Sequence, residues 1–363
     1  MAVPKDLDRE LLLFVGKGGV GKTTMAALAA VELAHNGRRT LLVTIDPAQR
    51  LEDALAVPVG HRPKAVRGKL HAMMLAPEKV VRDYLLEASP ERDLTKHPFY
   101  KYISDYLPGL NELMAIGQLV EFRRERDYDT IVLDTAPTGH ALSFLTTPMK
   151  VRDLLQENLF LRWAVRGYSM FQKISRGGRA LRGLVGRDLI PDAPDIDFEA
   201  LFKQIAADMG EVHELLRNED ATALHLVTVP ERLAVEETLD LHAYLTEQLD
   251  IWPAGVFVNK MTPRLVHQDL GRLAEDRQTR ARLRAALGAD GDLVDDLVEA
   301  ARFHETRRRM NELHLAALRK ALPAMPMREV PLQSNDVYGL DRLDELARLV
   351  YAAEPTPRAA QKR

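Results

Sequence analysis

The chain has 363 residues, enough for one large α/β domain or two smaller ones, with the apolar and charged content of a folded soluble protein. A formal net charge of −3 gives no overall attraction to nucleic acid, and the lack of cysteine excludes disulfides, thiolate metal sites, iron–sulfur clusters and cysteine nucleophiles. No apolar run approaches the roughly 20 residues that span a bilayer, and residues 1–10 lack a signal-peptide core, so we expect a cytoplasmic protein whose membrane contacts are peripheral.

The first predicted element is a strand from Leu11 to Val15, whose apolar residues suit burial on both faces of a sheet. Residues 16–23, GKGGVGKT, follow it and fit the phosphate-loop pattern GxxxxGK[ST] at every defined position. The next segment, MAALAAVELA, has a helix-forming composition, so its N-terminus would direct a partial positive charge at a bound phosphate. In such a loop Lys22 reaches the β- and γ-phosphates, and the Thr23 hydroxyl ligates Mg²⁺.

A second strand is expected from Arg38 to Ile45, and it is followed by Asp46 and Pro47. A carboxylate just past the carboxyl end of a strand beside the phosphate loop stands where ligands bind in open α/β sheets. Asp46 could therefore orient a water molecule for attack on the γ-phosphorus. An Asp before a Pro is equally typical of a helix N-cap, so the local pattern leaves both roles open and allows Asp46 to serve in both.

The apolar strand predicted from Thr130 to Leu133 ends in Asp134. A strand that ends in Asp downstream of a phosphate loop has the Walker B form, so Asp134 is predicted to hold Mg²⁺ through a water molecule. Thr135 and the residues after it, through Gly139, would form a loop that senses the γ-phosphate. His140, which follows, is interpreted as a packed or capping histidine rather than a base.

Residues 148–220 mix apolar and aromatic residues with arginines, and Gly177-Gly178 suggests a joint within them. One interpretation is an inserted helical subdomain that faces a client protein or a membrane. The other is a pair of ordinary amphipathic helices whose arginines extend to water. The sequence favours neither interpretation.

Two later predicted strands are also followed by candidate ligand-binding residues. The strand predicted at residues 255–258 is followed by Asn259, whose amide can both donate to and accept from the edge of an adenine base. After the last strand, Pro331 and Leu332 begin a segment that could wrap the same base.

The remaining elements complete an α/β pattern. Strands are expected at residues 69–75, 223–229 and 327–330, a basic loop at 60–68, and helices at 77–126, 265–322 and 337–353. The predicted fold is a mostly parallel central sheet flanked by helices. Residues 1–147 and 221–353 would form the two parts of the nucleotide-binding domain, residues 148–220 the helical insert, and residues 354–363 a disordered tail.

Lys17 stands five residues before Lys22, at a position where an ordinary phosphate loop makes no demand. This second lysine resembles that of the deviant Walker A loop of a dimeric ATPase superfamily. Six further segments follow in order: DPAQRLEDAL, LPGLNE, DTAPTGHALSFL, VPERLAVEET, VNK and VPLQSNDVYGL. With them, the chain from about Leu11 to Leu349 resembles the arsenite-pump and tail-anchored-protein-targeting ATPase family.

The resemblance implies a Mg–ATP-hydrolysing homodimer, or a heterodimer with a paralogue, because each chain carries one copy of the motifs. Lys17 would act across the interface on the partner's phosphates, Asp46 would activate water, and Lys22 would complete the catalytic set. Asp46 and Asp134 would contact Mg²⁺ through water, and Thr23 would contact it directly. With the contacts above, the predicted ATP-binding residues are Lys17, Gly18, Gly19, Val20, Gly21, Lys22, Thr23, Thr24, Glu231, Asn259, Pro331 and Leu332.

Some family features are altered or missing. Gln49 stands where the family has the His of DPAH, and Leu107 and Asn111 are substituted in the segment that reads PPGxDE in the family. In the family these positions lie in segments coupled to the nucleotide state. The chain is therefore expected to keep ATP hydrolysis but to alter its coupling to these segments. Because the chain has no cysteine, it can form neither an arsenite site nor the zinc clasp that Cys-x-x-Cys pairs build between targeting-factor subunits.

The first functional hypothesis is an ATPase whose closure builds a groove, from residues near 148–200, for a hydrophobic client helix or a membrane protein. The alternative is a spatial-organising ATPase, like the partition and septum-site proteins, that binds DNA or membrane. The basic residues of 148–187 keep this alternative open, although the net charge makes nucleic acid the less expected partner. A metabolic phosphoryl transferase has no motif of its own in the sequence.

Overall fold

The computed structural model describes residues 3–45, 50–75, 110–125, 127–135, 145–146, 198–265, 276–287 and 291–352. The strands are β1 (Leu11–Val15), β2 (Thr40–Thr44), β3 (Lys64–Arg67), β4 (Leu70–Met74), β5 (Thr130–Asp134), β6 (Thr222–Thr228), β7 (Gly255–Met261) and β8 (Met327–Pro331). The helices are α1 (Lys22–His35), α2 (Arg50–Leu55), α5 (Leu110–Glu125), α8 (Phe198–Arg217), α9 (Arg232–Gln248), α11 (Arg277–Leu287), α12 (Gly291–Ala321) and α13 (Leu340–Ala352).

The strands form one sheet in the order β3-β4-β2-β5-β1-β6-β7-β8. Neighbouring strands are parallel except β3 and β4, so the predicted mostly parallel α/β sheet is confirmed. After β1 the chain adds β2, β3 and β4 on one side, inserts β5 between β2 and β1, and then adds β6, β7 and β8 on the other side. Open α/β sheets bind ligands outside the carboxyl ends of the strands at such a reversal, which is where the phosphate loop leaves β1.

The basic loop predicted at residues 60–68 is wrong in part, because Lys64–Arg67 form the edge strand β3. Its side chains are exposed or half-exposed, and its antiparallel pairing with β4 shifts register between Ala65 and Arg67. Short charged strands are typical of sheet edges, where they discourage pairing with other chains. Only Val66 of β3 is partly buried against the core, so the sequence lacks the apolar alternation by which strands are recognised.

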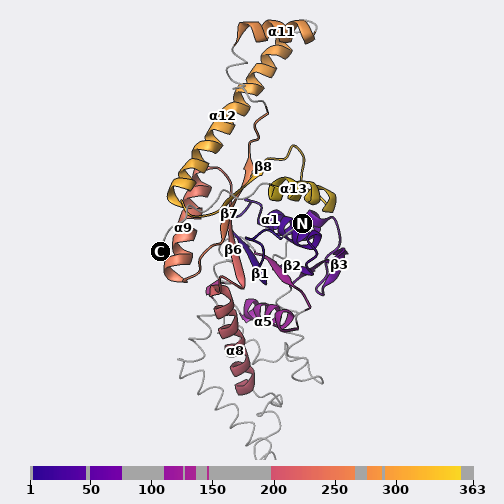
Figure 1. Ribbon diagram of the computed structural model, residues 1–363, viewed down its shortest axis with the longest axis vertical. Helices are drawn as coiled ribbons and strands as arrows, with labels where there is room; N and C mark the ends of the chain where they lie inside the picture. The colour runs from indigo at the N-terminus through magenta and orange to yellow at the C-terminus, as the bar shows by residue number, and fades with distance from the viewer. Residues whose placement is uncertain are drawn as a thin grey trace, which may run out of the picture.

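Strand β1 contributes to apolar cores on both faces of the sheet, which explains its uninterrupted apolar sequence. Leu11, Leu13 and Val15 belong to the core that α5, α8, α9 and α12 complete. Leu12 and Phe14 point the other way, into the core built mainly with α1 and α13. Figure 1 shows the same layers, with α9 and α12 on one side of the sheet and α1 and α13 on the other.

Only part of the predicted helical insert falls within the described residues. Helix α8 lies against α5 and β6, and its Leu215 and Leu216 are buried in the core. Residues 148–197 and the tail at 354–363 lie outside the described residues, so the division into domains stays a prediction.

The predicted helical segment at residues 265–322 contains α11 and α12. Figure 1 shows α12 running along the sheet and beyond it, with α11 at its far end. Among the described helices, none combines the length and apolar character that crossing a bilayer requires.

A buried charged cluster joins the segment before β1 to the last strand. The Arg328 guanidinium donates two hydrogen bonds of 2.7 Å to the Asp6 carboxylate. The Asp6 carbonyl oxygen lies 3.1 Å from Nε2 of His225, whose ring stacks on Phe14 at 5.2 Å and meets Phe257 edge-on at 5.3 Å. Burial lowers the pKa of His225 to about 4, and burial alone would raise the pKa of Asp6, but Arg328 holds that pKa below its ordinary value.

The His225 environment predicts acid-sensitive stability. An unfolded histidine has a pKa near 6.5, whereas His225 in the folded chain has a pKa of about 4. Between these two pH values the unfolded chain therefore binds a proton at this residue that the folded chain does not bind. The free energy of unfolding should therefore fall as the pH drops from 6.5 to 4, by up to about 1.4 kcal/mol per pH unit from this group. Substituting His225→Phe keeps an aromatic ring and should flatten this dependence, measured by urea denaturation at several pH values.

The control for this prediction is His61→Phe, which replaces an exposed histidine. A slope between pH 6.5 and 4 that is the same in His225→Phe as in the wild type would contradict the prediction.

Candidate functional site

The phosphate loop depends on glycine at three positions, either because a neighbouring strand leaves no room for a Cβ or because φ is positive. A Cβ added to Gly16 would stand 2.2 Å from the Val227 carbonyl oxygen of β6. Gly19 and Gly21 have φ values of 81° and 100°, which side chains rarely allow. A Cβ on Gly21 would also stand 2.3 Å from Nδ2 of Asn259. The loop therefore forms a backbone cradle of the kind that admits phosphate oxygens.

Helix α1 begins directly behind this cradle. Gly21 is its N-cap and offers no side chain to the first-turn N–H groups, and the first turn contains no acidic residue. Those N–H groups and the positive end of the helix therefore suit an anion. Lys22 is buried, and its Nζ donates to the Lys17 carbonyl oxygen at 2.9 Å, while Thr23 and Thr24 are half-buried in the first turn.

Two residues at the end of β7 brace the loop from the side. Nδ2 of Asn259 donates to the Val20 carbonyl oxygen at 2.8 Å, and its Oδ1 accepts from the Lys260 N–H at 2.8 Å. Lys260 has a φ of 60°, and its Nζ lies 3.3 Å from the Gly19 carbonyl oxygen. Sequence reasoning gave Lys260 no role, because nothing in VNK reveals which loop the strand end faces. The Asn259 amide retains a second N–H and further acceptor capacity, which are available to an adenine base. The contact with adenine itself stays a prediction.

Three other predicted ATP-binding residues lie near this strand end. The Leu332 N–H donates to the Met261 carbonyl oxygen at 2.7 Å, which keeps Pro331 and Leu332 beside β7. Glu231 is the exposed N-cap of α9. It lines, together with Lys260, a pocket of about 380 Å³ bounded on its other side by α12. The structure thus gathers these residues at the carboxyl ends of β6, β7 and β8, beside the phosphate loop.

Asp134 ends β5 between β1 and β2, where it pairs in register with Phe14 and Thr44. Its carboxylate is fully buried, and its Oδ2 accepts from the Thr44 hydroxyl at 3.2 Å. The Thr135 hydroxyl donates to the Phe14 carbonyl oxygen at 2.8 Å and ties the next residue to β1. Asp46, Gln49, Thr138, Gly139 and His140 lie outside the described residues, so their predicted roles stay predictions.

Lys17 and Lys22 extend in different directions. Whereas Lys22 folds back on the loop, Lys17 reaches α9, where its Nζ lies 2.6 Å from Oε1 of Glu237. The two side chains of this ion pair are 40% and 39% exposed. The Lys17 ammonium is therefore held at the surface, beside its own loop rather than in it.

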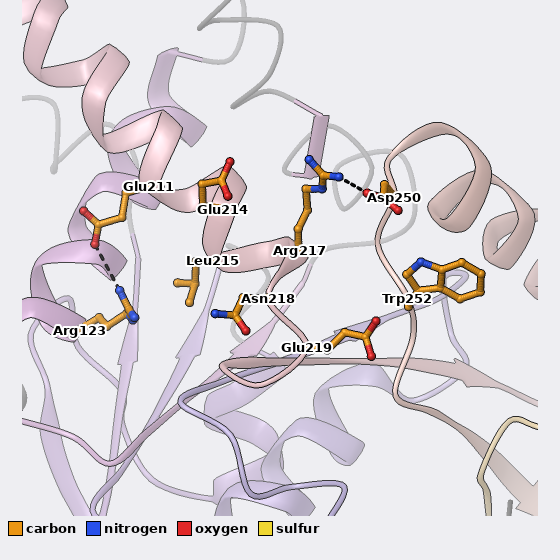
Figure 2. A pocket seen from close by; sticks show the side chains of 9 residues that line it. All are labelled: Arg123, Glu211, Glu214, Leu215, Arg217, Asn218, Glu219, Asp250 and Trp252. Carbon is orange, nitrogen blue, oxygen red and sulfur yellow. Dashed lines mark hydrogen bonds and ion pairs between the residues drawn. The ribbon is translucent and has the colours of Figure 1, made fainter. Parts of the chain in front are cut away.

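A larger pocket, of about 630 Å³, lies at the other end of the sheet. Figure 2 shows its side chains, including the ion pairs of Arg123 with Glu211 and of Arg217 with Asp250. Glu219, which also lines it, shortly precedes β6, so the pocket opens at the amino ends of the parallel strands. The larger pocket is therefore separate from the phosphate loop.

A family model described as anion-transporting ATPase matches residues 9–285, about three quarters of the chain. The chain belongs to the anion-transporting ATPase family. The match covers the phosphate loop, Asp46, Asp134, Glu231 and Asn259.

Similar relatives are named either as arsenical pump-driving ATPases or as ASNA1 and GET3 ATPases. An arsenical pump-driving ATPase of Aquifex aeolicus is 24% identical, over 97% of this chain and 81% of its own. An ATPase ASNA1 homolog of Babesia bovis is 31% identical, over 72% of this chain and 68% of its own. An ATPase GET3 of Malassezia globosa is 29% identical, over 74% and 84%.

The family and the cradle together establish the activity as ATP binding and hydrolysis. The resemblance to the pump and targeting ATPases is confirmed. The comparisons give no support to a partition or septum-site function.

The cradle geometry predicts the effect of a single methyl group. Gly21→Ala should weaken ATP binding at least about tenfold, because the methyl group overlaps Asn259 and the left-handed backbone costs an alanine about 1 kcal/mol or more. In an Asn259→Ala background the overlap is absent, so the same substitution should weaken binding only about fivefold. Calorimetric titration with a non-hydrolysable ATP analogue measures both effects.

Gly60→Ala is the matched control, since a Cβ there meets open space and it should bind ATP as the wild type does. If Gly21→Ala weakened ATP binding equally in the wild-type and Asn259→Ala backgrounds, overlap with the Asn259 side chain would not be a cause of the loss.

Proposed function

We propose that this ATPase works in the cytoplasm as a dimer, in which Mg–ATP closes two subunits on each other and closure creates a binding site for a hydrophobic client helix. The observation that carries this proposal is the position of Lys17. A lysine whose ammonium is held outside its own loop has no evident use on its own nucleotide, whereas a facing subunit would bring a second triphosphate within its reach. The resemblance of the loop to those of dimeric ATPases points the same way.

The proposed metal is Mg²⁺, and the donor atoms near the loop suit it. Thr23 offers a hydroxyl in the first turn of α1, and Asp134 offers a buried carboxylate at the end of β5. Mg²⁺ prefers oxygen ligands and keeps part of its water shell, so direct contact with Thr23 and contact through water with Asp134 are reasonable roles. When bound, the metal would neutralise charge on the β- and γ-phosphates.

The remaining catalytic roles follow from the sequence. Lys22 would contact the β- and γ-phosphates once they replace its bond to the Lys17 carbonyl oxygen. Asp46 directly follows Ile45, whose N–H donates to the Asp134 carbonyl oxygen at 3.2 Å. We assign Asp46 to orienting the attacking water, as the family resemblance implies.

The client is proposed to be an apolar helix for two reasons. Four relatives are named GET3 or ASNA1 ATPases, and the sequence of residues 148–200 mixes apolar and aromatic residues with arginines. Metalloid binding through thiolates is excluded by the lack of cysteine. Residues near 148–200 are the proposed source of the client surface.

Dimer closure makes a direct prediction for Lys17. The wild type should change from monomer to dimer when a non-hydrolysable ATP analogue and Mg²⁺ are added, in sedimentation velocity experiments. Lys17→Met should lower ATP turnover about 100-fold, because the transition-state charge loses a cation donated by the other subunit.

Lys320→Met, which removes an exposed lysine from α12, is the control and should keep normal turnover. A wild type that stays monomeric with the analogue, together with normal turnover in Lys17→Met, would reject the dimer.

Client binding makes a second prediction. A photo-crosslinking peptide with about 20 apolar residues should be captured by the wild type with the ATP analogue, and weakly without nucleotide. A polar helical peptide of equal length is the control for the peptide, and Lys17→Met is the control for closure. Equal capture with and without nucleotide would separate client binding from ATP and contradict this part of the proposal.

A further inference from the structure

The Lys17 ammonium already has a partner within its own subunit. Glu237 lies on the second turn of α9, and its Oε1 accepts a hydrogen bond of 2.6 Å from Nζ of Lys17. The other carboxylate oxygen, Oε2, is buried and has no hydrogen-bond partner among the described residues. Lys17 is therefore the hydrogen-bond donor that the described structure provides to this carboxylate.

The neighbouring glutamate behaves differently. Glu236 is more exposed than Glu237, and its nearest cation is Arg232, 4.0 Å away on the same helix. Two adjacent residues of α9 thus carry the same charge, but only one of them contacts the phosphate loop in the described structure. The contact between Lys17 and Glu237 joins residues 220 positions apart, so it depends on the fold and not on local helix geometry.

This contact conflicts with the proposed use of Lys17. An ammonium group held 2.6 Å from one carboxylate cannot at the same time extend across an interface to a triphosphate. Lys17 must leave Glu237 before it can serve the other subunit. The closed dimer therefore forms at the expense of one such ion pair in each subunit.

We propose that Glu237 is a positioning residue for Lys17, which holds the ammonium against α9 in the open subunit and releases it when two ATP-bound subunits close. This inference rests on the proposed ATP-closed dimer. Glu237 thereby opposes closure until a triphosphate, which carries more negative charge than a carboxylate, competes for Lys17. Closure in response to ATP would be tuned by the strength of this pair.

The exposure of the pair suits such an exchange. An ion pair exposed to this degree changes an equilibrium by up to about fivefold, so ATP can displace Glu237. Because a symmetric dimer breaks two pairs, the combined effect on dimer formation is expected to be about three- to twentyfold. It should shrink as salt is added, since surface charges are screened.

The test measures the dimer dissociation constant by sedimentation, with Mg²⁺ and a non-hydrolysable ATP analogue. Glu237→Gln keeps the size of the side chain and removes its charge, so the dissociation constant should fall about three- to twentyfold. The protein concentration that gives half-maximal ATP turnover should fall with it. Glu236→Gln, the matched control on the adjacent residue, should leave the dissociation constant unchanged. A tighter dimer is a result that damage to the fold would not produce.

A double-mutant cycle decides whether Glu237 acts through Lys17. In a Lys17→Met background Glu237→Gln should have no further effect on the dissociation constant. An equal effect in both backgrounds, an unchanged or weaker dimer in Glu237→Gln alone, or a tighter ATP analogue complex of the monomer without a tighter dimer would each overturn the inference. A wild type that forms no dimer with the analogue would instead reject the proposed function, and the inference with it.

Discussion

The shape of the phosphate cradle at the carboxyl end of the sheet depends on how closely the phosphate loop packs against β6 and β7. Gly16 has no room for a Cβ beside the Val227 carbonyl oxygen, and Gly21 has none beside the Asn259 amide. The parallel register of β1 and β6 brings Val15 level with Leu226, so the loop leaves the sheet directly against β6. The cradle is therefore shaped by neighbouring strands as much as by its own glycines.

The same loop keeps its positive charges apart. Lys22 is buried, and its ammonium donates to the Lys17 carbonyl oxygen within the loop. Lys17 lies at the surface and meets a carboxylate on α9. One lysine thus lies buried within the loop, and the other is held in a pair that water partly screens. In the proposed dimer, this separation would let one loop take part in two sites.

A buried charged cluster stabilises the amino end of the half of the sheet that contains β6, β7 and β8. Arg328 of β8 binds the Asp6 carboxylate, the Asp6 carbonyl oxygen meets His225 of β6, and the Arg328 guanidinium lies 4.7 Å from the centre of the Tyr351 ring on α13. Removing one partner of such a pair would leave a charge in a buried site, which is strongly destabilising. The cluster thereby helps to keep β6 and β8 aligned, and with them β7, whose end braces the phosphate loop.

The sequence determined the features that depend on local pattern. The apolar run of β1, the phosphate loop and the strand that ends in Asp134 are each contiguous, and the structure has them within a residue or two of their predicted bounds. Their order, together with the family motifs, was enough to predict a mostly parallel α/β sheet and ATP hydrolysis. The edge strand β3 was missed, since an exposed strand carries no apolar alternation.

Only the tertiary structure decided which distant residues meet. The bond from Asn259 to Val20 spans 239 positions, and the pair of Lys17 with Glu237 spans 220. No periodicity or motif predicts such contacts, because they follow from the order of strands in the sheet and from the helix that each strand end faces. The sequence therefore identified the chemical groups of the site, while the packing of β6, β7 and α9 decided which of them the phosphate loop contacts.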